Sequence, residues 1–281
     1  MAYGVKRPLL PLRTRHQGQE RRHLCSYPAG EAAPLPLIIA LHPGRSSPRG
    51  MARLTKLHRL GQEEGFAVLY VAGSGPRKRR LTWNADDNKD DANDVRAIAE
   101  AADAFSARFS VDPNRIYLVG FSQGAAMAYR FASEAGGDVA AIAAVSGSFL
   151  GDGRERSDDL SVFHLHGDLD ESVPLKGGSG RFTRKGRHWH PARQSIKRFT
   201  ASDETTSYRE TGPGLVVEGW IASDRSSEQR LTILEGSGHG WPGQPRRLWQ
   251  RLMRIPVRQD YRATEEIWAF LKDKRRSSVN R

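Results

Sequence analysis

The chain has 281 residues, of which 38% are hydrophobic, so it is long enough to bury a sizeable core without a metal or a disulfide. Its single cysteine, Cys25, excludes an internal disulfide and a thiol-rich zinc site, and we expect a free, buried thiol. The net charge of +12 makes nucleic acid, anionic membranes and acidic substrates candidate partners. The basic residues are scattered along the chain, however, which is typical of a solvated surface. We therefore expect no nucleic-acid partner.

Residues 1–20 are rich in Pro, Arg and Gln and show no apolar period, so we expect a flexible basic arm there and a basic tail at residues 275–281. The first thirty residues contain no apolar run long enough for a secretory signal, and no later run is long enough to span a bilayer. The sequence as written therefore predicts a cytoplasmic protein, or a secreted one if an N-terminal signal is missing from this chain.

Between these ends, short apolar runs alternate with helical patterns, which is the signature of a parallel sheet with crossover helices. The expected strands lie at residues 22–27, 36–41, 67–71, 116–119, 141–145, 161–165, 216–221 and 231–234. The expected helices lie at residues 51–64, 93–109, 123–134, 192–200 and 264–272. No repeat and no long linker divides the chain, so we expect one α/β domain over residues 21–274, with the Gly-rich stretch 177–190 as a surface loop.

The segment Gly120-Phe121-Ser122-Gln123-Gly124 follows an expected strand and opens an expected helix, which is the context that a nucleophile elbow requires. A serine in this strained turn leaves no room for side chains two residues before and after it, which explains the two glycines. The alternative is that Ser122 is only an N-cap and the glycines only turn residues.

A candidate acid follows the expected strand at 161–165, where a loop can present a carboxylate at the end of a parallel strand. In this loop Asp170 is the orienting acid that we favour, and Asp168 is its rival. Either aspartate alone is more often a turn or capping residue than a catalyst.

A candidate base, His239, lies in a glycine-rich loop after the expected strand at 231–234. Its imidazole has a pKa near neutrality, so it can take the Ser122 proton and return it to a leaving alcohol. The order Ser122, Asp170, His239 is the chain order of a hydrolase triad, and this order argues against the N-cap alternative.

The loop His42-Pro43-Gly44-Arg45 ends the expected strand at 36–41, where one donor of an oxyanion hole is expected. Pro43 has no N–H and cannot donate. The donors would be the backbone N–H of Gly44, or that of Arg45, together with the backbone N–H of Gln123.

Two histidine pairs, His164-x-His166 and His188-x-His190, each place two rings on one face of an extended segment, as metal ligands often do. No carboxylate or thiol ligand at a familiar spacing accompanies either pair, so we expect no metal and no cofactor.

Basic runs adjoin three of the expected site loops. They are Arg77–Arg80, then Arg181 with Arg184, Lys185 and Arg187, and finally Arg246 with Arg247. We hypothesise a basic rim that attracts anionic esters, with ordinary solvated surface charge as the alternative.

These residues support a resemblance: the chain is similar to the poly(3-hydroxybutyrate) depolymerase and feruloyl esterase family of α/β-hydrolases over residues 21–272. The pieces that carry it are Leu-His-Pro-Gly at 41–44, Thr-Trp-Asn at 82–84, the elbow at 120–124, His-Gly-x-x-Asp-x-x-Val-Pro at 166–174 and Gly-His-x-Trp-Pro-Gly at 238–243.

The resemblance implies the α/β-hydrolase fold, triad roles for Ser122, Asp170 and His239, and substrate contacts from Trp83 with Asn84 and from Trp241. Both tryptophans could instead be ordinary core residues. Acyl-protein thioesterases share the Gly-Phe-Ser-Gln-Gly elbow, so the elbow alone does not separate the two families.

The chain departs from the family in two ways. It has His-Pro where the family has His-Gly before the oxyanion donor, and it has one cysteine where exported members often have disulfides. Ester hydrolysis is therefore better supported than polymer hydrolysis. The expected function is a serine carboxylic-ester hydrolase similar to polyhydroxybutyrate depolymerases, which acts through an acyl-enzyme, and a polymeric or an anionic ester is a candidate substrate.

Three alternatives stay open. Within enzymes they are a feruloyl or acetyl carbohydrate esterase and an acyl thioesterase, and in another class a non-catalytic binding protein on a hydrolase scaffold. The sequence does not determine the oligomeric state.

Overall fold

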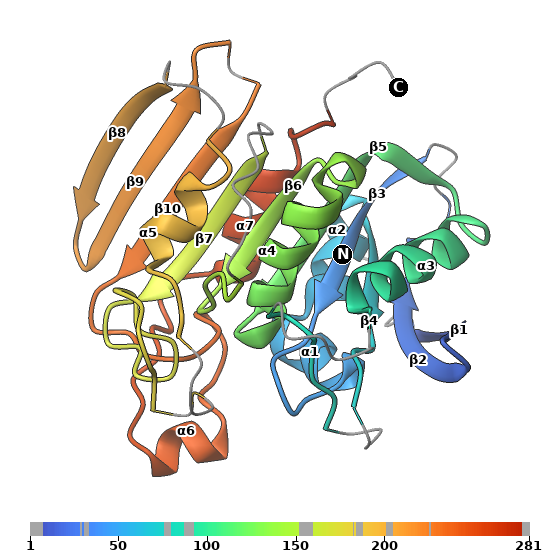
Figure 1. The fold of residues 1–281 in the computed structure, drawn as a ribbon, viewed down its shortest axis with the longest axis horizontal. Helices are drawn as coiled ribbons and strands as arrows, with labels where there is room; N and C mark the ends of the chain where they lie inside the picture. The colour runs from blue at the N-terminus through green and yellow to red at the C-terminus, as the bar shows by residue number, and fades with distance from the viewer. Residues whose placement is uncertain are drawn as a thin grey trace, which may run out of the picture.

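The computed structural model describes residues 8–28, 30, 34–75, 80–86, 93–151, 160–181, 183, 188–200, 205–224 and 226–276. The strands within these ranges form one ten-stranded sheet in the order β1-β2-β4-β3-β5-β6-β7-β10-β9-β8, and helices cover both of its faces (Figure 1). The strands are β1 (Leu10–His16), β2 (Gln19–Ser26), β3 (Leu35–Leu41), β4 (Ala67–Val71), β5 (Val111–Phe121), β6 (Ala141–Val145), β7 (Ser161–Gly167), β8 (Thr205–Gly212), β9 (Leu215–Ala222) and β10 (Glu228–Leu234).

The central strands β4, β3, β5, β6, β7 and β10 pair in parallel, and the flanking strands pair antiparallel. Their sequences explain the burial, since β3 reads Leu-Pro-Leu-Ile-Ile-Ala-Leu and every one of its residues is buried. The helices are α1 (Pro48–Thr55), α2 (Leu57–Glu64), α3 (Asp94–Ser106), α4 (Gln123–Ala135), α5 (Ala192–Lys197), α6 (Leu248–Leu252) and α7 (Ala263–Leu271).

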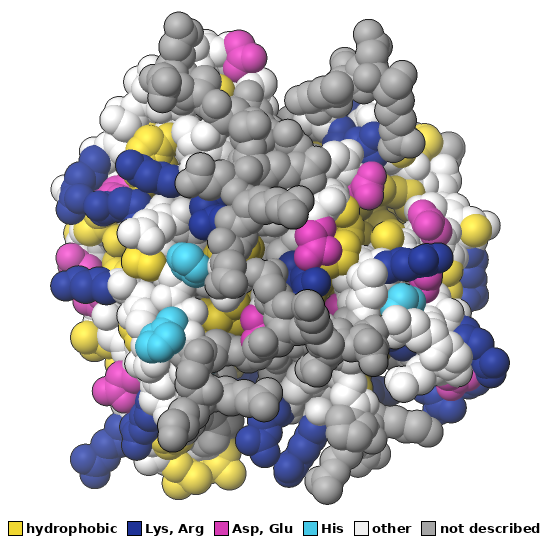
Figure 2. Space-filling view, viewed as in Figure 1, with side chains coloured by type: hydrophobic (Ala, Val, Ile, Leu, Met, Phe, Trp, Pro, Cys, Tyr) yellow, Lys and Arg dark blue, Asp and Glu magenta, His cyan; other side chains and the backbone are white. Residues whose placement is uncertain are grey.

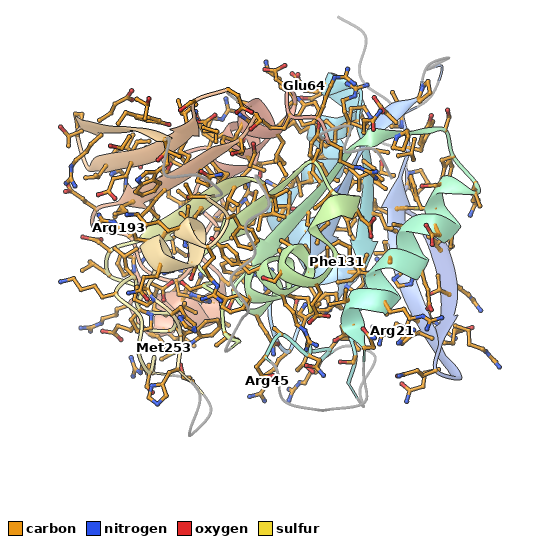
Figure 3. All side chains as sticks on the ribbon, turned by 45° about the horizontal axis from the view of Figure 1, so that its top comes forward. Arg21, Arg45, Glu64, Phe131, Arg193 and Met253 are labelled. Carbon is orange, nitrogen blue, oxygen red and sulfur yellow. The ribbon has the colours of Figure 1, made fainter. Side chains whose placement is uncertain are left out.

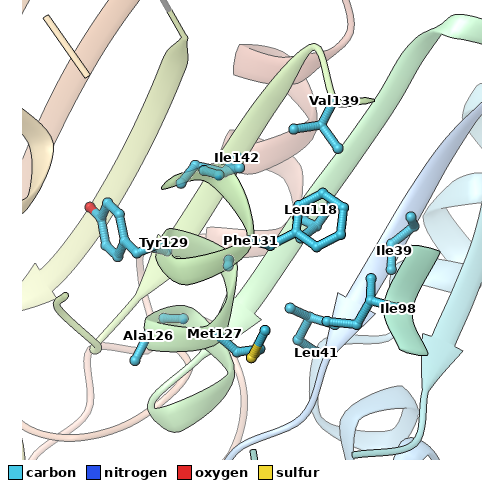
Figure 4. Close-up of a cluster of buried hydrophobic side chains, with 14 of the residues drawn as sticks. Ile39, Leu41, Ile98, Leu118, Ala126, Met127, Tyr129, Phe131, Val139 and Ile142 are labelled. Carbon is cyan, nitrogen blue, oxygen red and sulfur yellow. The ribbon is translucent and has the colours of Figure 1, made fainter. Parts of the chain in front are cut away.

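Alternate residues of β3 enter two separate cores, one on each face of the sheet. Ile39 packs with Ile98 of α3 and Met127 of α4 in the first core, which Figure 4 shows in close-up. Ile38 packs with Met51 of α1 and Ile267 of α7 in the second core. This burial of both faces of a mostly parallel sheet is the layered architecture that the sequence predicts.

The predicted arm at residues 1–20 is wrong over its second half, because Leu10–His16 is strand β1 in an antiparallel hairpin with β2. Leu12 and His16 point inward, whereas Arg13 and Arg15 face solvent, so the strand lacks an uninterrupted apolar run. Gln17 and Gly18 both have positive φ, which is typical of a two-residue hairpin turn. Residues 1–7 and 277–281 lie outside the described residues.

Other differences are smaller. The predicted helix at 51–64 is two helices, since Lys56 between α1 and α2 has a φ of 53°. Strand β8 and helix α6 were not predicted, because β8 is mostly polar and exposed and α6 has only five residues. In the stretch 177–190, residues 182 and 184–187 lie outside the described residues, and Gly178 forms a bridge with Trp189.

Cys25 lies on β2 and is fully buried, as predicted. Burial raises the pKa of its thiol to about 11, so the thiolate is scarce at neutral pH. Over the described ranges, no helix combines the length and the apolar character needed to cross a bilayer.

Candidate active site

Ser122 stands in the turn between β5 and α4, at the carboxyl edge of the sheet, with φ 55° and ψ −120°. A non-glycine residue with positive φ is strained, and the neighbouring strand holds it there because its N–H donates to Val145 O at 2.9 Å. The glycines are required by contact: a Cβ on Gly120 would lie 2.2 Å from Gly124 O, and one on Gly124 would lie 2.2 Å from Leu41 O.

Asp170 and His239 come together from the loops after β7 and β10. His239 Nδ1 lies 2.8 Å from Asp170 Oδ2, and a carboxylate only accepts, so Nδ1 carries the proton. The other oxygen, Asp170 Oδ1, accepts from the N–H groups of Ser172 at 2.8 Å and Val173 at 2.9 Å. Nε2 of His239 is thereby left as the basic nitrogen. The rival Asp168 is exposed on the turn beside this pair.

Asp170 is held in its charged form although it is only 4% exposed. Burial alone would raise the pKa of this carboxyl, but the charge of His239 and the hydrogen bond from that ring lower it, with help from Val173 N–H. The net direction is a lowered pKa, so Asp170 is an anion at neutral pH.

Aromatic rings fix the His239 loop against the elbow. Phe121, the residue before Ser122, stacks on the His239 ring with centroids 5.2 Å apart, and Trp241 meets the edge of Phe121 at 6.0 Å. Gln250 Nε2 donates to His239 O at 2.8 Å from the segment that contains α6. His239 therefore stands beside the end of β5 that carries Ser122.

The expected oxyanion donors lie next to each other. Gln123 is the first residue of α4, where a backbone N–H has no helical acceptor. A Cβ on Gly44 would lie 2.7 Å from Gln123 Oε1, so the two residues are in contact. Gln123 Nε2 donates to Trp83 O at 3.0 Å, and Trp83 N donates to Gln123 Oε1 at 3.4 Å, so this side chain joins the two loops. Arg45, the alternative source of the first oxyanion donor, has a φ of 60°.

The residues expected to contact substrate are enclosed. Trp83 is 3% exposed and its indole N–H donates to His42 O at 2.6 Å, while Trp241 is 1% exposed and its indole N–H donates to Thr264 Oγ1 at 3.1 Å. Both rings belong to the cores, so they support the site from behind. Asn84 Oδ1 accepts from Arg130 at 2.5 Å. This hydrogen bond ties the Asn84 side chain to α4, and because the two residues lie 46 positions apart no local pattern indicates it.

A chain of buried hydrogen bonds leads to the acid loop, and sequence analysis missed it. His166 Nε2 lies 2.8 Å from Val173 O, which only accepts, so Nε2 carries the proton of this ring. Because burial lowers the pKa of His166, the ring is neutral, and its Nδ1 accepts from His164 Nε2 at 2.8 Å. His164 Nδ1 in turn accepts from the hydroxyl of Tyr129 at 2.7 Å. The histidines that suggested a metal pair are thus donor and acceptor to each other.

The basic runs of the sequence are only partly described. Residues 76–79 and 184–187 lie outside the described residues, whereas Arg80, Arg181 and Arg246 are exposed. Arg181 is 3.4 Å from a carboxylate oxygen of Glu171, which reduces its attraction for a distant anion.

The family described as Esterase PHB depolymerase matches residues 23–175, which is more than half of the chain. Ser122 and Asp170 fall inside this match, and His239 follows it.

Two curated proteins and one solved structure are also similar. The bifunctional acetylxylan esterase/xylanase of Neocallimastix patriciarum is 25% identical over 226 residues, which is 80% of this chain and 32% of that protein. Feruloyl esterase B of Piromyces equi is 25% identical over 232 residues, which is 78% of this chain and 42% of that protein. The chain thus spans less than half of either relative. The structure of acetyl xylan esterase from Aspergillus awamori has a TM-score of 0.57 at 14% identity and covers 78% of this chain and 89% of that one.

Proposed function

The chain belongs to the Esterase PHB depolymerase family, and from this premise we propose that it hydrolyses carboxylic esters in two steps through an acyl-enzyme on Ser122. The observation that carries the proposal is the 2.8 Å hydrogen bond between His239 Nδ1 and the buried carboxylate of Asp170. It leaves a basic Nε2 on a ring that stacks on Phe121, the neighbour of Ser122.

In the first step, Ser122 Oγ attacks the ester carbonyl while His239 Nε2 takes its proton. The resulting oxyanion is stabilised by the N–H groups of Gly44 and Gln123, and the tetrahedral intermediate collapses with transfer of the proton to the leaving alcohol. In the second step, a water molecule gives its proton to His239 and attacks the acyl carbonyl, which releases the acid and restores Ser122. Asp170 stays ionised and stabilises the imidazolium in both steps.

The substrate that the comparisons favour is an acetyl or feruloyl ester, since one named relative is an acetylxylan esterase and the other a feruloyl esterase. Polyhydroxybutyrate is the second candidate, because the family takes its name from it. A panel of methyl ferulate, acetylated xylan, polyhydroxybutyrate and an acyl thioester ranks these substrates by kcat/KM.

Replacement of the nucleophile tests the proposal. Ser122→Ala should reduce hydrolysis of p-nitrophenyl acetate by about 10⁴-fold or more and abolish labelling by a fluorophosphonate probe. The matched control is Ser110→Ala, which alters an exposed serine just before the start of β5 and should retain both properties. Full activity of folded Ser122→Ala would exclude the mechanism, and absence of both activity and labelling in the unaltered protein would favour a non-catalytic scaffold.

A further inference from the structure

A cavity of about 420 Å³ opens between α1 and the loop that follows His239. Its charged lining comes from Arg53 and Lys56 at the end of α1 and from Arg247 on the opposite wall. Leu54 and Pro245 add apolar surface. Among the described residues no acidic side chain lines the cavity, so three cations face this space with apolar contacts beside them.

Hydrogen bonds tie one wall of this cavity to the catalytic base. Arg247 N donates to Gln250 Oε1 at 2.7 Å, and Gln250 Nε2 donates to His239 O at 2.8 Å. The guanidinium of Arg247 crosses to α1, where it donates to Gly50 O at 3.2 Å.

A second chain of hydrogen bonds joins the His239 loop to the end of α1. Trp241, two residues after His239, donates from its indole N–H to Thr264 Oγ1 at 3.1 Å. Thr264 Oγ1 donates at 2.8 Å to the carbonyl of Thr55, which is the neighbour of Lys56. The cavity therefore lies between the loop that carries the base and the helix that follows the Gly44 loop. Arg45, shortly before α1, and Met253, just after α6, are labelled near the same edge of the molecule in Figure 3.

None of the three cations has a carboxylate partner among the described residues. Within the part of the chain that the structure describes, no ion pair involves Arg53, Lys56 or Arg247, whereas Arg21 and Arg130 each hold a carboxylate within 2.7 Å. Burial lowers the pKa of Arg247, the direction expected for a charge with no neighbouring anion. Lys and Arg side chains also gather along the lower edge of the molecule in Figure 2. An anion of the right size would therefore be attracted without displacing a described carboxylate.

We propose that this cavity binds a carboxylate carried by the substrate, so that the enzyme prefers esters whose acyl chain or alcohol ends in an acid group. The apolar stem of such an ester would lie against Leu54 and Pro245, and its carboxylate would meet Arg53, Lys56 and Arg247. The inference rests on the proposed ester hydrolysis at Ser122 and names the substrate class that this site takes.

A pair of matched esters measures the preference. Mono-p-nitrophenyl adipate carries a free carboxylate, and its methyl ester is a neutral compound of nearly the same shape. The readout is the ratio of kcat/KM for the anionic ester to that for the neutral one, at low and at high salt. The test protein is the double variant Arg53→Gln/Lys56→Gln. The control, Arg108→Gln/Lys272→Gln, removes two exposed charges after α3 and α7.

The expected result is that the ratio falls about fivefold or more in the Arg53→Gln/Lys56→Gln protein and by less than about twofold in the control, because only the first pair faces the cavity. High salt should reduce the ratio of the unaltered protein toward that of the double variant. Equal ratios in all three proteins would overturn the proposal, and equal losses in both double variants would show an effect of net charge alone and overturn it too.

The experiments distinguish a wrong esterase proposal from a wrong proposal that the cavity binds a carboxylate. If the unaltered protein hydrolyses neither ester, the esterase proposal fails, and calorimetric titration with free adipate then tests the cavity alone. Adipate binding that Arg53→Gln/Lys56→Gln weakens and the control retains supports the anion site, and absence of adipate binding overturns it.

Discussion

His166 Nε2 lies 3.6 Å from Asp170 Oδ2, the same oxygen that accepts the hydrogen bond of His239. Both rings therefore lie next to the same oxygen of the acid. His166 Nε2–H donates a hydrogen bond to Val173 O, and the N–H of Val173 donates to the other oxygen of Asp170. The neutral ring thus holds the turn that orients the acid.

His166→Leu should lower kcat about tenfold with little change in KM, because the Val173 turn loses its donor and Asp170 is held less firmly. His166→Gln retains an amide N–H for Val173 O and should recover part of the rate. Tyr129→Phe, at the far end of the same hydrogen-bond chain, should keep kcat within about twofold while lowering the free energy of unfolding by about 1–3 kcal/mol. Steady-state kinetics and urea unfolding separate these effects, and equal rates in the Leu and Gln variants would argue against a positioning role.

The two aspartates of the acid loop should differ strongly. Asp170→Asn should reduce kcat by about 10³–10⁴-fold, because an amide no longer fixes the His239 tautomer or stabilises its charged form. Asp168→Asn, which changes an exposed carboxylate two residues away, should remain within about twofold of the unaltered rate. Hydrolysis of p-nitrophenyl acetate measures both, and a reversed order would assign the acid to Asp168.

Gln123→Ala should lower kcat for p-nitrophenyl acetate about tenfold although its backbone N–H is unchanged. The lost side chain joins the elbow to the Trp83 loop and contacts Gly44, so both oxyanion donors become less well placed. The helix should stay intact, since alanine favours it. An unaltered kcat would show that backbone packing alone positions the donors.

The stability of the protein should decrease as the pH falls from about 6.5 to about 4. Burial lowers the pKa of His23 and of His42 to about 4, with the charge of Arg21 adding to the effect on His23. An unfolded chain binds these protons at pH values below about 6.5, so protonation favours unfolding, by about 3 kcal/mol per histidine once titration is complete. Burial also lowers the pKa values of His164 and His166.

Urea unfolding between pH 7.5 and 4.5 measures this decrease. His23→Gln should make the decrease in the free energy of unfolding smaller, because glutamine takes up no proton. Its side-chain oxygen can still accept the hydrogen bond that Ala72 N donates to His23 Nδ1 at 3.0 Å. A pH dependence identical to that of the unaltered protein would show that His23 is not protonated on unfolding.

Local patterns explain what the sequence predicted well. The parallel strands are predictable because most of them contain a short apolar run, and the elbow is predictable because steric contact demands glycine at fixed positions around Ser122. Strand β1 was missed because its inward residues alternate with arginines that read as a basic arm.

Tertiary contacts explain what the sequence did not show. Arg53 and Lys56 are distant in sequence from Arg247, and only the fold brings α1 to the loop after His239. Likewise, nothing local indicates that Trp241 would be buried behind Phe121. Short motifs therefore predict the catalytic residues of the site, but they do not predict the residues that pack around it.

Cys25, fully buried in β2 with a thiol pKa of about 11, has a practical consequence for spectroscopy. A thiol that is inaccessible and protonated reacts slowly with maleimides, so labelling of Cys25 should contribute almost no fluorescence. One introduced cysteine, for example Leu252→Cys on α6, where the native side chain is 75% exposed, would carry a single fluorophore close to the proposed anion cavity. Ligand entry could then be followed in real time with a protein that needs no other change.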